Sequence, residues 1–101
     1  MPRKSINSTP LRERKLKELQ TIPSVGKSIA LDLWNLGIRQ TSDLKGKNPR
    51  VLYEKLNTLS GTTQDKCVLY TFRCAVYFAS ERSHETKKCK WWYWKNKEYN
   101  E

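Results

Sequence analysis

The stretch Leu19-Gln20-Thr21-Ile22-Pro23-Ser24-Val25-Gly26-Lys27-Ser28-Ile29-Ala30 decides the fold. A helix expected from Pro10 to about Gln20 ends here, because proline lacks a backbone donor and disfavours the α conformation in the residue before it. A second helix is expected from Gly26 to Leu36, where Gly37 is typical of a C-terminal stop. The stretch therefore predicts two helices joined by a turn of about four residues.

Each residue type in this turn has an expected role. Val25 is apolar and is expected to dock the turn between the two helices, while Gly26 lets the backbone bend and lets another backbone approach closely. Ala30 is small where the helices pack. The second helix then points its free N-terminal amides outward, and these amides and the helix dipole form an anion site. The phosphate-binding residues that we predict are Ser24, Val25, Gly26, Lys27 and Ser28.

The rest of the sequence predicts further helices and no strand, which makes the fold class all-α with about five helices. A short connecting helix is expected at residues 41–45, and another helix is expected between Asn48-Pro49 and Ser60-Gly61. The next helix is expected from Thr63 to about Ser80, after an approximate capping box. It is apolar nearly all round from residue 67 to residue 79, with Arg73 as its only charge, so we expect it to be the buried centre of the domain.

The chain has 101 residues, enough for one domain, and a formal net charge of +10. A charge this high favours an anionic partner. We expect a basic disordered arm at residues 1–8, a helical domain at 9–80 and a basic aromatic C-terminal tail at 81–101. The cations expected to add secondary contacts to nucleic acid are Arg12, Arg14, Lys15 and Lys17.

The turn and its two helices resemble the helix-hairpin-helix motif of DNA-repair and recombination proteins. Proteins with this motif bind the DNA backbone through amides of the hairpin, largely without sequence preference. Their hairpin usually carries a glycine, an apolar residue and a second glycine, and Ser24 stands here at the first glycine position. The resemblance implies phosphate binding by residues 24–28.

The resemblance extends to one specific group, the small bacterial helix-hairpin-helix proteins of the pathogenicity-locus family, some of which are called mitomycin-resistance proteins. It rests on Leu36-Gly37-Ile38-Arg39, on the segment from Asp65 to Ala79 and on Lys90-Trp91-Trp92-Tyr93-Trp94. Membership implies a paired, SAM-like arrangement, in which two helix-hairpin-helix units are joined by a connector helix. The second, degenerate unit would lie around residues 59–62.

Catalytic and metal sites find little support in the sequence. Three cysteines and one histidine could be drawn as metal ligands (Cys67, Cys74, His84 and Cys89), but they contain no Cys-x-x-Cys pair. We expect the helical cysteines to be core residues and Cys89 to be an exposed, reactive thiol. Asp43 lies slightly too early to match the catalytic aspartate of helix-hairpin-helix glycosylases. We therefore expect no enzyme activity, no cofactor and no metal.

The cluster Trp91-Trp92-Tyr93-Trp94 has two interpretations. The tryptophans could stack on unpaired bases, or they could fold back onto the core, and we favour packing because so dense an apolar cluster is rarely left in water. No apolar run approaches the ~20 residues that a membrane span needs, and no signal-peptide core follows Met1. We expect a cytoplasmic monomer without membrane contact.

The function expected from these features is that of a non-sequence-specific DNA-binding module, with a role in repair or recombination. Duplex or branched DNA is the expected partner, and RNA is an alternative. A protein-interaction adaptor built on the same fold is the competing hypothesis.

Overall fold

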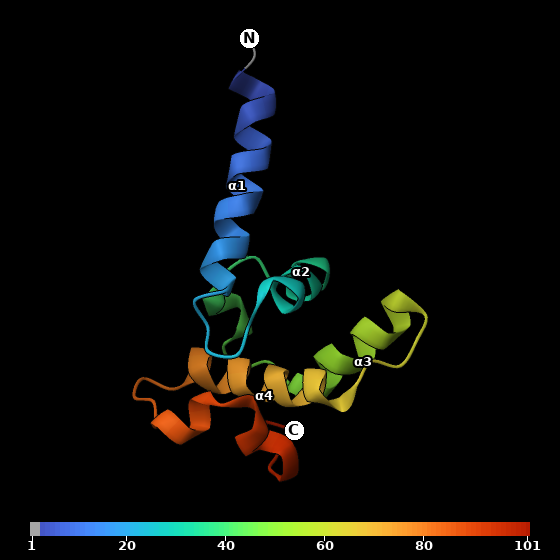
Figure 1. The fold of residues 1–101 in the computed structure, drawn as a ribbon, viewed down its shortest axis with the longest axis vertical. Coiled ribbons are helices and arrows are strands. Elements are labelled where there is room, and N and C mark those ends of the chain that lie inside the picture. The colour runs from blue at the N-terminus through green and yellow to red at the C-terminus, as the bar shows by residue number, and fades with distance from the viewer. Residues whose placement is uncertain (1–2) are drawn as a thin grey trace.

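The computed structural model describes the backbone of residues 3–101 and the side chains from Leu11 onwards. This part of the chain contains four α-helices, three 3₁₀-helices and no strand, so the predicted all-α class is confirmed (Figure 1). The elements in chain order are α1 (Arg3–Leu19), α2 (Lys27–Asn35), η1 (Thr41–Leu44), α3 (Pro49–Ser60), α4 (Lys66–Ser80), η2 (Thr86–Cys89) and η3 (Trp91–Asn96).

Helix α1 begins at Arg3 and not at Pro10, where the sequence places the start. Residues 3–8 contain no glycine or proline that would stop a helix. The disordered arm expected over residues 1–8 thus overlaps a helical backbone from Arg3, and its residues 1 and 2 lie outside the described part. Figure 1 shows α1 standing away from the other helices, with its C-terminal end near α2.

The ends of α2 and α3 agree with the sequence, because local signals set them. Gly37 follows α2 with a φ of +91°, and Gly61 ends α3 with a φ of +73°, values that glycine adopts readily. Asn48 caps α3, since its side chain accepts hydrogen bonds from the amides of Arg50 and Val51.

The predicted start of the central helix is wrong, because a different cap is used. Helix α4 begins at Lys66 and not at Thr63, because the Asp65 carboxylate accepts a 2.9 Å hydrogen bond from the amide of Cys67. The connector η1 begins at Thr41, as predicted, and is a 3₁₀-helix with Gln40 at its cap position. The segment expected to be a basic aromatic tail, residues 81–101, includes the short helices η2 and η3.

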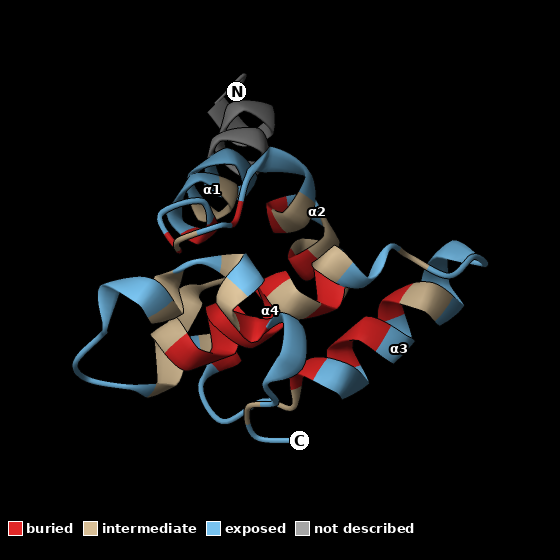
Figure 2. Cartoon of the chain, turned by 60° about the horizontal axis from the view of Figure 1, so that its bottom comes forward, coloured by how far each residue is buried: buried red, intermediate tan, exposed pale blue. Residues whose placement is uncertain are grey.

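Helix α4 forms the centre of the molecule, as predicted from its apolar surface. It packs against α3, η1, η2 and η3, and Figure 2 shows its buried residues at the middle of the fold. Its buried side chains are Val68, Leu69, Thr71, Phe72, Arg73, Cys74, Ala75, Val76 and Tyr77. Among the described residues, every helix falls short of the length and apolar character that a membrane span requires.

The segment after α4 returns along this helix and packs against it. Trp94 is only 4% exposed, and its ring lies 5.5 Å from that of Tyr77. The side-chain amide of Asn100 donates to the carbonyls of Gly46 and Lys47, which holds the segment against the residues after η1. The predicted packing of the tryptophans is confirmed for Trp94, whereas Trp91 is half-buried and Trp92 is exposed.

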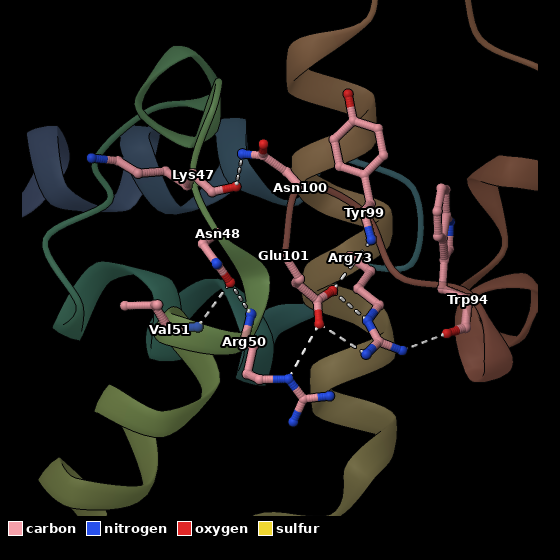
Figure 3. A network of polar contacts seen from close by, with 9 residues as sticks. All are labelled: Lys47, Asn48, Arg50, Val51, Arg73, Trp94, Tyr99, Asn100 and Glu101. Atoms are coloured by element: carbon pink, nitrogen blue, oxygen red, sulfur yellow. Dashed lines mark hydrogen bonds and ion pairs between the residues drawn. The ribbon is translucent and has the colours of Figure 1, made fainter.

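An ion pair inside the fold fixes the end of this segment (Figure 3). The side chains of Arg73 and Glu101 are 5% and 4% exposed, and they are joined by hydrogen bonds of 2.6 Å and 3.0 Å. Arg73 also donates to the carbonyl of Trp94 at 2.9 Å, and Arg50 lies 3.3 Å from the carboxylate. Burial alone would raise the pKa of Glu101, but hydrogen bonds from Arg73 and Tyr99 and the two positive charges outweigh it and lower that pKa.

Removing this carboxylate should destabilise the fold in a pH-dependent way. We expect Glu101→Gln to lower the free energy of unfolding near pH 7 by about 3–5 kcal/mol, because it leaves a buried arginine unpaired. Since the folded-state pKa of Glu101 is lowered, the wild-type advantage should be complete above its ordinary pKa of about 4.3 and should vanish as the pH falls through the lowered value.

Urea denaturation of both proteins between pH 7 and pH 2 measures this difference. Glu98→Gln is the control, because Glu98 carries the same charge on the same segment but is exposed. Two results would contradict the structural role of the ion pair. One is an equal loss of unfolding free energy in both variants, and the other is a difference in unfolding free energy between wild type and Glu101→Gln that does not shrink at acid pH.

Candidate nucleic-acid interface

The turn between α1 and α2, residues 20–26, is held to the core by two apolar side chains. Ile22 and Val25 are 1% and 5% exposed, and the amide of Val25 donates to the carbonyl of Ile22 at 3.0 Å. Ala30 on α2 is fully buried in the same cluster. Val25 therefore docks the turn, and Ala30 lies at a tightly packed position, as the sequence predicts.

The sharp bend of the turn lies at Ser24 and not at Gly26, which corrects the expected role of the glycine. Ser24 has a φ of +71°, in the left-handed region that costs a residue with a β-carbon about 1–2 kcal/mol. Gly26 has a φ of −95° and a ψ of −169°, an extended conformation open to any residue. A β-carbon added there would meet no atom within 4 Å. The fold therefore does not require a glycine at position 26.

Ser24 is held in its conformation by the chain that follows η2. Its hydroxyl oxygen accepts a 3.1 Å hydrogen bond from the amide of Trp91, and the hydroxyl donates to the carbonyl of Cys89 at 3.3 Å. These bonds join the turn to the junction between η2 and η3. They also occupy the hydroxyl proton, so the Ser24 side chain supports the turn and does not offer a ligand a free donor.

The N-terminus of α2 is open. Gly26 is its cap residue and supplies no side-chain hydrogen bond, and the first intrahelical bond runs from the amide of Ala30 to the carbonyl of Gly26. Residues 26–28 are exposed, and within the described residues no acceptor is bonded to the amides of Lys27 and Ser28. Free amides at the positive end of a helix are suited to an anion.

Helix α4 provides an internal comparison, because its N-terminus is closed. Asp65 places a carboxylate at the position that Gly26 holds before α2, and hydrogen bonds from Cys67 lower the pKa of that carboxyl. The fixed negative charge already occupies the site that a phosphate would use. Of these two helix starts, only that of α2 can accept an external anion.

Three of the predicted basic residues meet beside the open helix end. Arg12, Lys17 and Lys27 line a hollow of about 450 Å³ between α1 and α2. The other residues that line this hollow are Glu13, Leu16, Gln20 and Leu31. The hollow thus extends the positive potential of the α2 terminus along α1.

The other two predicted contacts on α1 lie apart from this hollow. Lys15 donates through Nζ to Oε1 of Gln40 at 3.1 Å, and Arg14 is exposed outside the lining of the hollow. Sequence reasoning missed Arg39, whose guanidinium lies 3.8 Å from the ring centre of Trp34, with Arg12 at 5.9 Å from the same ring. The sequence did contain one indication of this contact. Lys27 and Trp34 are seven residues apart, which places Trp34 on the same face of α2 as the predicted site residue Lys27.

The residues considered for catalysis or metal binding make hydrogen bonds within the fold or are buried in it. Asp43 accepts hydrogen bonds from the amides of Arg39 and Gln40, and His84 bonds the carbonyl of Phe78 through Nε2. Cys74 is fully buried, and burial raises the pKa of its thiol to about 11. Cys89, expected to be exposed, is half-buried. Across the described residues, no three potential metal ligands gather in one place.

The sequence of this chain is similar to those of known proteins. The family model described as "Pathogenicity locus" matches residues 12–100. The mitomycin resistance protein McrB of Streptomyces lavendulae is 29% identical over 77 residues, which cover 76% of this chain and 70% of that protein. No solved structure matches the chain.

The conformation of Ser24 can be tested with a pair of substitutions. Ser24→Ala and Ser24→Gly both remove the hydroxyl, but only alanine keeps a β-carbon at a φ of +71°. We expect the glycine variant to be the more stable by about 1 kcal/mol, since glycine adopts the left-handed region freely. Urea denaturation measures the difference, and an alanine variant at least as stable as the glycine variant would rule out this conformation.

Proposed function

The chain belongs to the pathogenicity-locus family, and we propose that it binds DNA by the phosphate backbone, without reading sequence, through the start of α2. The proposal treats α1, the turn and α2 as a helix-hairpin-helix unit. The α3–α4 pair would be the second, degenerate unit, in which Asp65 has replaced the anion site.

The observation that carries the proposal is the glycine at position 26. Its conformation is open to any residue, the space around its Cα is empty, and Ser, Thr, Asp or Asn would cap α2 at least as well, so neither packing, backbone geometry nor capping requires a glycine here. A functional reason is available: without a β-carbon at position 26, a large anion can reach the amides of Lys27 and Ser28. A phosphate group of DNA has the charge and the acceptor oxygens for this position.

The charges around the turn support a polyanionic ligand. Lys27 lies at the helix start, and Lys17 and Arg12 continue along the hollow between α1 and α2. Contacts of this kind go to phosphates, which are the same for every base pair, so they position a protein on DNA without specifying sequence. The arrangement fits a module that holds DNA for other proteins, as in repair or recombination, and we propose that it acts in the cytoplasm without a catalytic group or cofactor of its own.

A protein-interaction adaptor is the second candidate, and one observation favours it. Leu11 and Leu31 are 47% and 39% exposed on α1 and α2. These side chains would suit an apolar partner surface as well as they suit the edge of a DNA site. The dependence on salt separates the candidates, because counterion release makes DNA affinity fall steeply as salt rises.

The test is an anisotropy titration of one labelled duplex at several salt concentrations. Lys27→Ala should weaken binding by about fivefold and reduce the slope against log salt by about one unit. Gly26→Val should weaken binding more, because its β-carbon blocks the amides. The variant should still fold, with a stability loss of about 1 kcal/mol for the poorer N-cap residue, since a β-carbon there meets no atom within 4 Å and φ is ordinary.

Lys66→Ala is the matched control. Lys66 is also the first residue of its helix and is also exposed, but Asp65 closes that helix end, so its removal should change the affinity little. If Gly26→Val and Lys27→Ala fold and bind DNA as wild type does, the α2 terminus is not the site, and the adaptor function becomes the better explanation.

A further inference from the structure

The three tryptophans of the C-terminal segment have different environments. Trp94 is buried, and its indole N–H donates to the carbonyl of Lys88 at 2.9 Å. Trp91 is half-buried and lies nearly parallel to Tyr70, with ring centres 6.5 Å apart. Trp92 is 58% exposed. Packing therefore accounts for the first two tryptophans, whereas more than half of Trp92 is exposed to solvent.

Trp92 offers an aromatic surface that the protein leaves in solvent. Its one ring neighbour among the described residues is Trp91, which meets it nearly perpendicularly at 84° with ring centres 5.9 Å apart. The ammonium group of Lys90 lies 5.8 Å from the ring centre of Trp92. Among the large apolar side chains of the described residues, only Leu59 is more exposed than Trp92.

Trp92 lies close to the turn between α1 and α2 because its neighbour in the chain contacts that turn. The amide of Trp91 bonds Ser24, so Trp92 is one residue from a direct contact with the turn. The open amides of Lys27 and Ser28 follow Ser24 by three and four residues, a chain reach of at most ~14 Å. A nucleic acid bound at the α2 terminus would thus have the Trp92 ring within a few nucleotides.

The local charge is also that of a nucleic-acid surface. Residues 86–97 contain five lysines and no acidic residue. Lys88 is paired with Glu85, whereas Lys87, Lys90 and Lys95 are exposed and form no ion pair within the described residues. Lysines interleaved with an exposed aromatic ring are the combination with which proteins hold single strands, the lysines on phosphates and the ring on a base.

We propose that Trp92 stacks on an unpaired base of a DNA strand whose adjoining duplex is held at the α2 terminus. The proposal rests on the proposed function, and it specifies the ligand as DNA at a junction between duplex and single strand. Lys90 would contact the phosphate beside the stacked base. The surface then selects forked or tailed DNA over blunt duplex by the structure of the DNA, without reading its sequence.

The test compares binding to a blunt duplex with binding to the same duplex carrying an oligothymidine tail. Wild type should prefer the tailed DNA, and Trp92→Leu, which keeps apolar bulk but has no ring, should reduce that preference by about 5- to 100-fold. Trp92→Phe should keep most of the preference. Leu59→Ala, which removes a comparably exposed apolar side chain on α3, should leave it unchanged.

A second readout reports stacking directly. A 2-aminopurine placed in the tail should be quenched by wild type and by Trp92→Phe but not by Trp92→Leu, because fluorescence of this base is lost on stacking against an aromatic ring. Unchanged preference and quenching in Trp92→Leu would overturn this inference and leave the duplex site intact. Loss of blunt-duplex binding in Lys27→Ala and Gly26→Val but not in Trp92→Leu would show that the two sites are separate.

Discussion

The buried guanidinium of Arg73 is the constraint on which the rest of the structure depends. Helix α4 is apolar nearly all round and is surrounded by other elements, yet it carries this one charge at its centre. A charge removed from water must be paired and hydrogen-bonded, and two carboxylate oxygens and one carbonyl do this for Arg73. Both partners come from the segment after α4, so this segment must return across the helix that it has just left.

The course of that segment determines the geometry of the candidate site. The same arginine binds the carbonyl of Trp94 in η3, and η3 begins at Trp91, whose amide bonds Ser24 in the turn. Cys74, one residue after Arg73, contacts both sides of this junction. Its Sγ lies 3.7 Å from the carbonyl oxygen of Pro23 and 3.6 Å from that of Lys88. One turn of α4 therefore supports both the C-terminal segment and the turn that precedes α2.

Signals confined to a few residues made the helical fold predictable from the sequence. Gly37, Gly61 and Asn48-Pro49 set their helix ends through local backbone conformation and capping, and the apolar circumference of α4 marked it as the centre. The features that sequence analysis missed depend on distant residues. Arg73 and Glu101 are 28 positions apart, so the pattern of charges did not connect them. The bend of the turn was expected at Gly26 but lies at Ser24. Nothing in the sequence around the turn indicated this, because the residue that supports Ser24 is 67 positions away.

The hydrogen bond between Trp91 and Ser24 has a consequence for the order of folding. Because 67 positions separate its partners, it closes a very large loop, whereas the helices on either side of the turn require only neighbouring residues. A chain emerging from the ribosome cannot make this bond to Ser24 until Trp91 has been synthesised. A nascent chain that still lacks residues 89–101 therefore has the sequence of the turn without the two hydrogen bonds that support Ser24.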